Sequence, residues 1–198
     1  MAQVKTIGEA VRNMSVLMAN MYYHLTKAVI EDFGDEAKGS FKRAIIEFGH
    51  ERGRNIAKNV LDAGLPLTLE NLDKFYDIPI AEGWDLHRSY ENDMKMNVTD
   101  SCTFATVWLE KNWAEVGHIY CLIDIAIREG YSSNVKFCPV KNILEGDPHC
   151  QSLTVYRDVS KKVSKRQMRI KVLIPNSGMD RKTLNARETM LSPAGPPA

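Results

Sequence analysis

Residues that could act as bases, nucleophiles or metal ligands are concentrated between Gly117 and Cys150. Histidines, cysteines and aspartates of this kind supply general acid–base, nucleophilic and metal chemistry, so we expect the functional site in this region. A second polar stretch, from Trp84 to Cys102, precedes it and adds Glu91. The candidates in the first stretch are His118, Cys121, Asp124, Cys138, Asp147, His149 and Cys150.

A group made of a thiol, an imidazole and a carboxylate is the most economical interpretation of these residues. Cys121 or Cys150 could be a nucleophile if His118 or His149 stabilises its thiolate. A carboxylate, Asp124 or Glu91, could orient that imidazole or activate a water molecule. The competing interpretation is structural, because free cysteines are among the most buried residue types and are usually unreactive.

Metal binding is the weaker hypothesis. Glu115 and His118 have the Glu-x-x-His spacing that puts two ligands on one helical face, but the chain contains one copy where di-iron bundles repeat it. The four cysteines form no Cys-x-x-Cys pair, and their spacings fit no standard structural zinc pattern. We therefore expect no metal and no other cofactor. The chain also lacks the Gly-x-Ser-x-Gly, Walker and dinucleotide-binding motifs.

Two arginines stand beside glycines in the segment FGHERGRN, residues 48–55. Gly49 and Gly53 are unfavourable inside a helix, by about 1 kcal/mol each relative to alanine. Small residues four apart allow another backbone to approach closely, and helix packing is the plain explanation for them. The functional alternative is that Arg52 or Arg54 binds a carboxylate of the substrate.

The composition is that of an ordinary globular protein, with 198 residues, 44% of them hydrophobic and 26% charged. A formal net charge of +1 gives no indication of a nucleic-acid or membrane partner. No apolar run approaches the ~20 residues of a membrane span, and the N-terminus does not resemble a signal peptide. The four scattered cysteines do not suggest a disulfide framework, so we expect a cytoplasmic protein.

Hydrophobic periodicity predicts an α+β fold, with N-terminal helices packed on a small antiparallel sheet with inserted helices. On the helix over 114–129, three- and four-residue steps place Glu115, His118, Cys121 or Leu122, and Asp124 or Ile125 on one broad face. The ribbon over 84–98 alternates strictly, and residues 91–93 are either a hairpin turn or a charged spot on one long strand. The other predicted elements are helices over 3–32, 36–63, 68–77 and 103–112 and strands over 134–140 and 150–157. We expect Gly34 and Gly130 to end the helices that precede them, and Thr68 and Ser101 to cap the helices that follow them. We assign residues 1–157 to a single domain and residues 158–198 to a basic arm and disordered tail.

Helix 3–32 has a long apolar stripe that includes Ile7, Met14, Leu17, Met21 and Leu25. Such a stripe is typical of a core face or a subunit interface. Because a chain of this size has limited core, we expect a homo-oligomer, most often a dimer. Either this helix or residues 158–175 would supply the contacts.

The order of several of these residues resembles the L-2-amino-thiazoline-4-carboxylic acid hydrolase family. The most specific segments are GHIYCLIDIAI, residues 117–127, and LEGDPHCQSLTVY, residues 144–156. The resemblance runs from about Phe41 to Tyr156, and a fainter similarity connects the chain to vinyl-4-reductase-like ligand-binding domains. The residues that match are Trp84, Cys102, Glu115, Gly117, Tyr120, Cys121, Asp124, Phe137, Gly146, Asp147 and Cys150.

The resemblance implies a hydrolase that acts on a carbon–nitrogen bond of a small, carboxylated cyclic amidine. Water would add to the carbon between nitrogen and sulfur, which needs a base, a proton donor and a cation for the carboxylate. Asp124 or Glu91, His118, and Arg52 or Arg54 can fill these three roles. The catalytic candidates are thus His118, Cys121, Asp124, Glu91 and Cys150, and the substrate-binding candidates are Arg52, Arg54, Trp84, Tyr120 and His149. A non-catalytic small-molecule-binding or sensory module on the same fold is the alternative, and a structural subunit is a third possibility.

Overall fold

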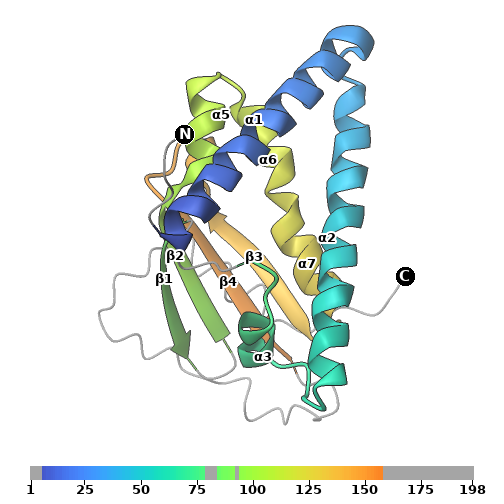
Figure 1. The fold of residues 1–198 in the computed structure, drawn as a ribbon, viewed down its shortest axis with the longest axis vertical. Coiled ribbons are helices and arrows are strands. Elements are labelled where there is room, and N and C mark those ends of the chain that lie inside the picture. The colour runs from blue at the N-terminus through green and yellow to red at the C-terminus, as the bar shows by residue number, and fades with distance from the viewer. Residues whose placement is uncertain (1–5, 79–83, 92–93, 158–198) are drawn as a thin grey trace, which may run out of the picture.

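A computed structural model describes residues 6–78, 84–91 and 94–157 of the chain. Two long helices, α1 (Ile7–Phe33) and α2 (Ala37–Asp62), form an open hairpin at its N-terminal end (Figure 1). Thr6 and Glu9 form a capping box that satisfies backbone N–H groups at the start of α1. Gly34 ends α1 with φ +73°, a conformation that favours glycine, as the sequence predicted.

Four antiparallel strands form one sheet in the order β1-β2-β4-β3. β1 (Trp84–Glu91) and β2 (Met94–Cys102) pair as a hairpin. Of the two alternatives for the alternating segment, the hairpin is therefore correct and the single long strand is not. Asn92 and Asp93, between them, lie outside the described residues. The other two strands, β3 (Val135–Lys141) and β4 (Cys150–Tyr156), fall where the sequence predicted them. This arrangement confirms the α+β class.

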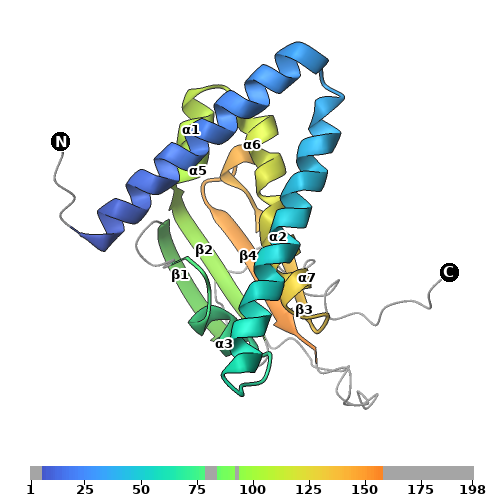
Figure 2. The same cartoon turned by 45° about the vertical axis from the view of Figure 1, so that its right-hand side comes forward.

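Helices α2 and α7 (Leu122–Tyr131) cover one face of the sheet (Figure 2). The main core lies there, built from side chains of α2, α3, α7 and β3. The remaining elements are α3 (Leu69–Lys74), α5 (Thr103–Glu110), α6 (Ala114–Tyr120) and the short 3₁₀ helix η1 (Ile143–Glu145). The hydroxyl of Thr68 caps α3 by accepting a hydrogen bond from the Asn71 N–H at 3.2 Å, as expected.

Helices α2 and α7 approach so closely that their glycines touch the opposite backbone. A Cβ atom on Gly53 would lie 2.2 Å from the carbonyl oxygen of Ile127, and one on Gly49 would lie 2.5 Å from Cβ of Ala126. The close approach that the FGHERGRN segment predicted is therefore confirmed, and it fixes the position of α7 over the sheet.

Three local predictions were wrong. The helix predicted over 114–129 is interrupted at Cys121, so that it forms two helices, α6 and α7. Gly130 does not end the second of them, since it lies inside α7, where an added Cβ atom would be 2.4 Å from the carbonyl oxygen of His50. Ser101 is not a helix cap: it belongs to β2, and Cys102 precedes α5 without a side-chain capping bond.

The face of the sheet turned away from the helices has its own apolar cluster, with Met94, Val140, Leu153 and Val155 buried and Met96 beside them. No helix in the described parts of the chain is long and apolar enough to cross a membrane. The predicted basic arm, residues 158–198, lies outside the described residues, and the division at residue 157 stays a prediction.

Candidate functional site

A cavity of about 220 Å³ lies between the helical layer and the covered face of the sheet. Helices α2, α3, α6 and α7 supply one wall, and inward-facing residues of the four strands supply the other. One end is aromatic: Trp84, Phe104, Trp108 and Tyr120 form a chain of ring contacts, with neighbouring centroids 5.2–5.7 Å apart. The remainder of the lining is polar and charged.

Six of the ten predicted site residues line this cavity. Cys121 and Asp124 reach it from the junction of α6 and α7, and Cys150 reaches it from the first residue of β4. From the sequence we expect Cys121, Asp124 and His118 to line one cavity with Cys150, and all of these except His118 do so. The six residues are Arg52, Trp84, Tyr120, Cys121, Asp124 and Cys150.

The other four do not line it. Arg54 is exposed, because two steps along a helix turn a side chain about 200° away from Arg52. Glu91 is exposed at the end of β1, on the side opposite to Arg88 by strand alternation. His118 lies outside the cavity, with Nδ1 3.7 Å from Oε1 of Glu145. His149, in the turn before β4, is partly buried away from the lining.

Asp124 forms an ion pair with a buried arginine, Arg128, which is not among the predicted site residues. Nη1 of Arg128 donates to Oδ1 of Asp124 at 2.7 Å and to the Asp124 carbonyl at 3.0 Å. The Arg128 side chain is only 7% exposed, whereas that of Asp124 is 46% exposed. The guanidinium also lies over the Phe137 ring, 4.7 Å from its centroid. Oδ2 of Asp124 makes no hydrogen bond to a described residue, so this oxygen is available to a water molecule or ligand.

A second buried ion pair lies in the same cavity. Nζ of Lys95 donates to Oδ1 of Asp73 at 2.5 Å, and the hydroxyl of Tyr90 donates to Oδ2 at 2.7 Å. The Lys95 side chain is 1% exposed. Burial lowers the pKa of Lys95, and the adjacent Asp73 carboxylate partly offsets this. Both oxygens of Asp73 are thus occupied, in contrast to those of Asp124.

Cationic residues outnumber acidic residues in the lining of the cavity. Five cationic residues and two acidic residues line it, and a carboxylate just outside the lining, Asp77, pairs with one of the cations, which leaves an excess of two positive charges. Arg52 is held in place by a two-point contact with Asp77, at 2.8 and 2.6 Å. An excess of positive charge in a partly enclosed cavity favours an anionic ligand. The cations are Arg52, Arg88, Lys95, Arg128 and Lys141, and the acids are Asp73 and Asp124.

The cavity cysteines are thiols rather than thiolates at neutral pH. Burial raises the pKa of Cys102 and of Cys121, and it raises the pKa of Cys150 to about 11. Sγ of Cys150 accepts a hydrogen bond from the Ile143 N–H at 3.4 Å and donates to Oδ1 of Asn142 at 3.9 Å. The partners of the Cys150 thiol are thus amide groups and not an imidazole. Such thiols keep their protons at neutral pH and are therefore poor nucleophiles.

We predict that iodoacetamide will alkylate Cys150 slowly in the native protein at neutral pH. A pKa of about 11, against ~8.5 for a free thiol, reduces the thiolate population roughly 300-fold. The rate should rise steeply as the pH approaches 11 and should reach the ordinary value in urea. Peptide mapping by mass spectrometry over a pH series would measure it. A native rate equal to the unfolded rate at pH 7.5 would contradict a buried thiol.

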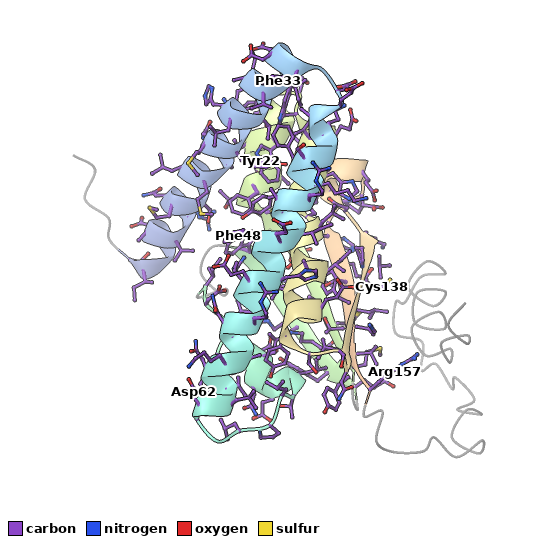
Figure 3. The ribbon with its side chains drawn as sticks, turned by 90° about the vertical axis from the view of Figure 1, so that its right-hand side faces the viewer. Tyr22, Phe33, Phe48, Asp62, Cys138 and Arg157 are labelled. Atoms are coloured by element: carbon purple, nitrogen blue, oxygen red, sulfur yellow. The ribbon has the colours of Figure 1, made fainter. Side chains whose placement is uncertain are left out.

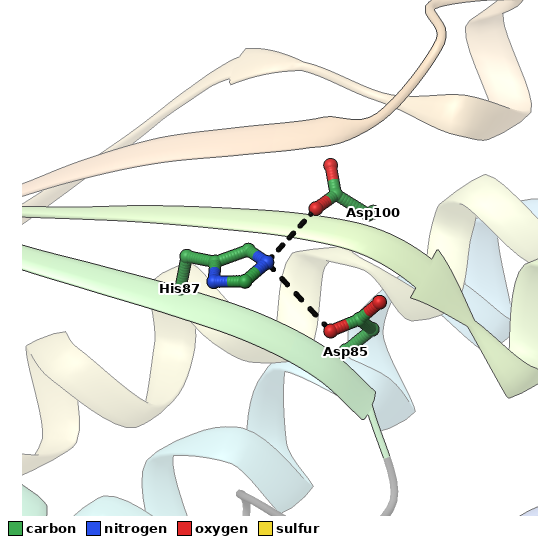
Figure 4. Close-up of side chains that lie close together, drawn as sticks. All are labelled: Asp85, His87 and Asp100. Carbon is green, nitrogen blue, oxygen red and sulfur yellow. Dashed lines mark ion pairs between the residues drawn. The ribbon is translucent and has the colours of Figure 1, made fainter.

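The potential metal ligands do not converge on the cavity. Within the described parts of the chain, one group of three has its ligand atoms within 4.8 Å of one another: Asp85, His87 and Asp100. Figure 4 shows Nε2 of His87 between the two carboxylates, 3.1 Å from Asp100 and 3.7 Å from Asp85. All three are exposed, and alternation along β1 turns Asp85 and His87 away from the cavity that Leu86 and Arg88 line. We interpret the group as a surface ion pair.

A model of the L-2-amino-thiazoline-4-carboxylic acid hydrolase family matches residues 14–153. No curated protein matches the chain. Among solved structures, the chain is similar to a trafficking protein particle complex subunit 3 from Naegleria fowleri covalently bound to palmitic acid. That match has 14% identity and a TM-score of 0.45, and it covers 73% of this chain and 95% of the other.

Proposed function

The chain belongs to the L-2-amino-thiazoline-4-carboxylic acid hydrolase family, and we propose that it opens a small carboxylated cyclic amidine by adding water. The observation that carries this proposal is the half-exposed Asp124, fixed by Arg128 at one oxygen and free at the other, in a cavity with excess positive charge. A carboxylate fixed in this way is a suitable general base for water.

The size and lining of the cavity support a ligand of this class. A volume of about 220 Å³ suits a single small ring better than a drug-sized molecule, for which pockets of roughly 300–1,000 Å³ are usual. The aromatic end, with Trp84 and Tyr120, would pack against the ring. Arg88 and Lys141 line the cavity as cations that could bind the ligand's carboxylate.

In the proposed reaction Asp124 takes a proton from water as the water oxygen bonds to the carbon between nitrogen and sulfur. Arg128 keeps the Asp124 carboxylate in one orientation. It also lies close to this carboxylate, whose negative charge is neutralised when it takes the proton. The ring bond from that carbon to the leaving heteroatom then breaks, and this atom needs a proton. Asp124 can return to this atom the proton that it took from water. Burial raises the pKa of Tyr120 to about 12 and also raises that of Cys121, so both groups stay protonated and could donate a hydrogen bond to the leaving atom. In this proposal the proton donor is therefore not His118, which lies outside the cavity.

Incubation of the purified chain with L-2-amino-thiazoline-4-carboxylic acid tests the proposal. We expect a product heavier by one water molecule, seen by mass spectrometry, at a rate proportional to protein concentration. The same ring without its carboxylate is the matched control, and it should be a much poorer substrate because it lacks the group that the cations bind. Saturable binding without turnover would instead support the non-catalytic binding module, and neither binding nor turnover would reject this substrate class.

A further inference from the structure

The apolar stripe of α1 faces outward in the structure. Its five large members are 57–68% exposed, although a stripe of this kind usually packs against the core. These five residues form the outer stripe: Ile7, Met14, Leu17, Met21 and Leu25.

The opposite side of α1 is the one that packs, and it uses small or polar residues. Ser15, Ala19 and Thr26 are the buried residues of the helix. The indole N–H of Trp108 donates to the Ala19 carbonyl at 3.0 Å, and that of Trp113 donates to the Thr26 hydroxyl at 2.9 Å. Large tryptophans opposite small residues let α1 lie close to α5, so the large apolar side chains are directed away from the fold. Figure 3 shows α1 at the margin of the molecule, with Tyr22 on its inner side.

We propose that the outer stripe is the contact between two copies of this chain, packed helix against helix about a twofold axis. Its members recur at the three- and four-residue steps of a helix–helix seam: Ile7, Met14 and Met21 are seven apart, and Leu17 lies between them. A surface patterned in this way is complementary to itself, as a twofold interface requires.

The dimensions of the stripe fit this occupant. From Ile7 to Leu25 it is about 27 Å long. Five large side chains at this exposure present roughly 600 Å² per copy, so two copies would bury on the order of 1,200 Å², the lower end of the range for stable interfaces. The flexible thioethers of Met14 and Met21 would let the two copies adjust to each other.

Other occupants fit less well. The apolar piece of the basic arm, Val172–Pro175, has four residues and spans at most about 14 Å when extended, half the length of the stripe. A helix that lies on an anionic membrane is usually basic on its polar face. Helix α1 instead carries three acidic residues and two basic ones: Glu9, Glu31 and Asp32, with Arg12 and Lys27.

Analytical ultracentrifugation of the full chain and of Leu17→Glu at about 10 µM tests the proposal. We expect a dimer for the unchanged chain and a monomer for Leu17→Glu, because each copy would bring a carboxylate to the apolar contact. Leu17 is 62% exposed, so the variant should keep its helical circular dichroism. Leu61→Glu is the matched control: Leu61 is 58% exposed on α2, outside the stripe, and this variant should stay dimeric.

Two results with the full-length chains would overturn the proposal, and a third would come from truncation. One is a monomeric mass for the unchanged chain at this concentration, and the other is a folded Leu17→Glu variant that still forms the dimer. A chain truncated after Arg157 should remain dimeric, and a dimer lost on truncation would assign the contact to residues 158–198 instead.

Discussion

Replacing Asp124 with asparagine should lower kcat about 10²- to 10⁴-fold, the usual range for the loss of a general base. Asparagine has nearly the same shape, and its amide oxygen can still accept the hydrogen bond from Arg128 that Oδ1 now accepts. The variant therefore removes the base and leaves most of the positioning. We expect KM to change little, because the proposed base acts on water and the cavity cations bind the substrate.

Measurements of kcat, KM and the thermal midpoint for the unchanged chain, Asp124→Asn and Asp85→Asn would separate catalysis from stability. Asp85 is exposed on the outer side of β1, so Asp85→Asn makes the same chemical change away from the cavity and should retain normal turnover. An unchanged kcat in Asp124→Asn would reassign Asp124 to the ion pair alone. An equal loss in both variants would point to a general effect of charge.

The shared position of Cys121, Asp124 and Cys150 could be predicted from the sequence, although one step of the argument was wrong. The helix expected over 114–129 breaks at Cys121, yet the residues on either side of the break keep their side chains towards the sheet. Helical spacing over one turn was enough to put Cys121 and Asp124 together. The same spacing does not place His118 with them, because six residues along a helix turn its side chain about 120° away from that of Asp124, and His118 lies beside Glu145 instead.

Lys95 and Asn97 were missed because a hairpin reverses the alternation. In a single long strand, Arg88 and Lys95 would lie on opposite faces. In the hairpin, Tyr90 pairs with Lys95 and Arg88 pairs with Asn97, so even-numbered residues of β1 share a face with odd-numbered residues of β2. Which residues of β1 and β2 share a face depends on the register of the hairpin. The sequence could not decide whether residues 91–93 form a turn, so it could not predict this register. Arg128 had an available signal: it is four residues after Asp124, the spacing of a helical ion pair.

The sequence also could not predict which side of α1 packs against the rest of the fold. Its apolar stripe was recognised, but burial depends on what lies opposite, and Trp108 and Trp113 select the small residues Ala19 and Thr26. A pattern of this kind predicts a contact surface but does not show whether its partner is the core of the same chain or another molecule.

Replacing Gly53 with alanine should lower the free energy of unfolding by roughly 2 to 4 kcal/mol. The added Cβ would lie 2.2 Å from the Ile127 carbonyl oxygen and 2.7 Å from the Tyr131 nitrogen. Both are backbone atoms of α7, which cannot turn aside as a flexible side chain can, so α2 and α7 must move apart. The movement would also disturb the cavity, since Arg52 on α2 and Asp124 and Arg128 on α7 line it.

Urea unfolding of Gly53→Ala at a fixed protein concentration, beside Gly39→Ala, would measure this effect. Gly39 is in the same helix, but a Cβ there would meet only the end of the Arg43 side chain, at 3.8 Å. Gly39→Ala should therefore stabilise the protein by about 0.5–1 kcal/mol, the ordinary gain from replacing glycine inside a helix. The two variants make one chemical change with opposite expected signs. A stabilising effect at Gly53 equal to that at Gly39 would mean that α2 and α7 are not in backbone contact in solution, and the position of Asp124 beside the cavity would lose its support.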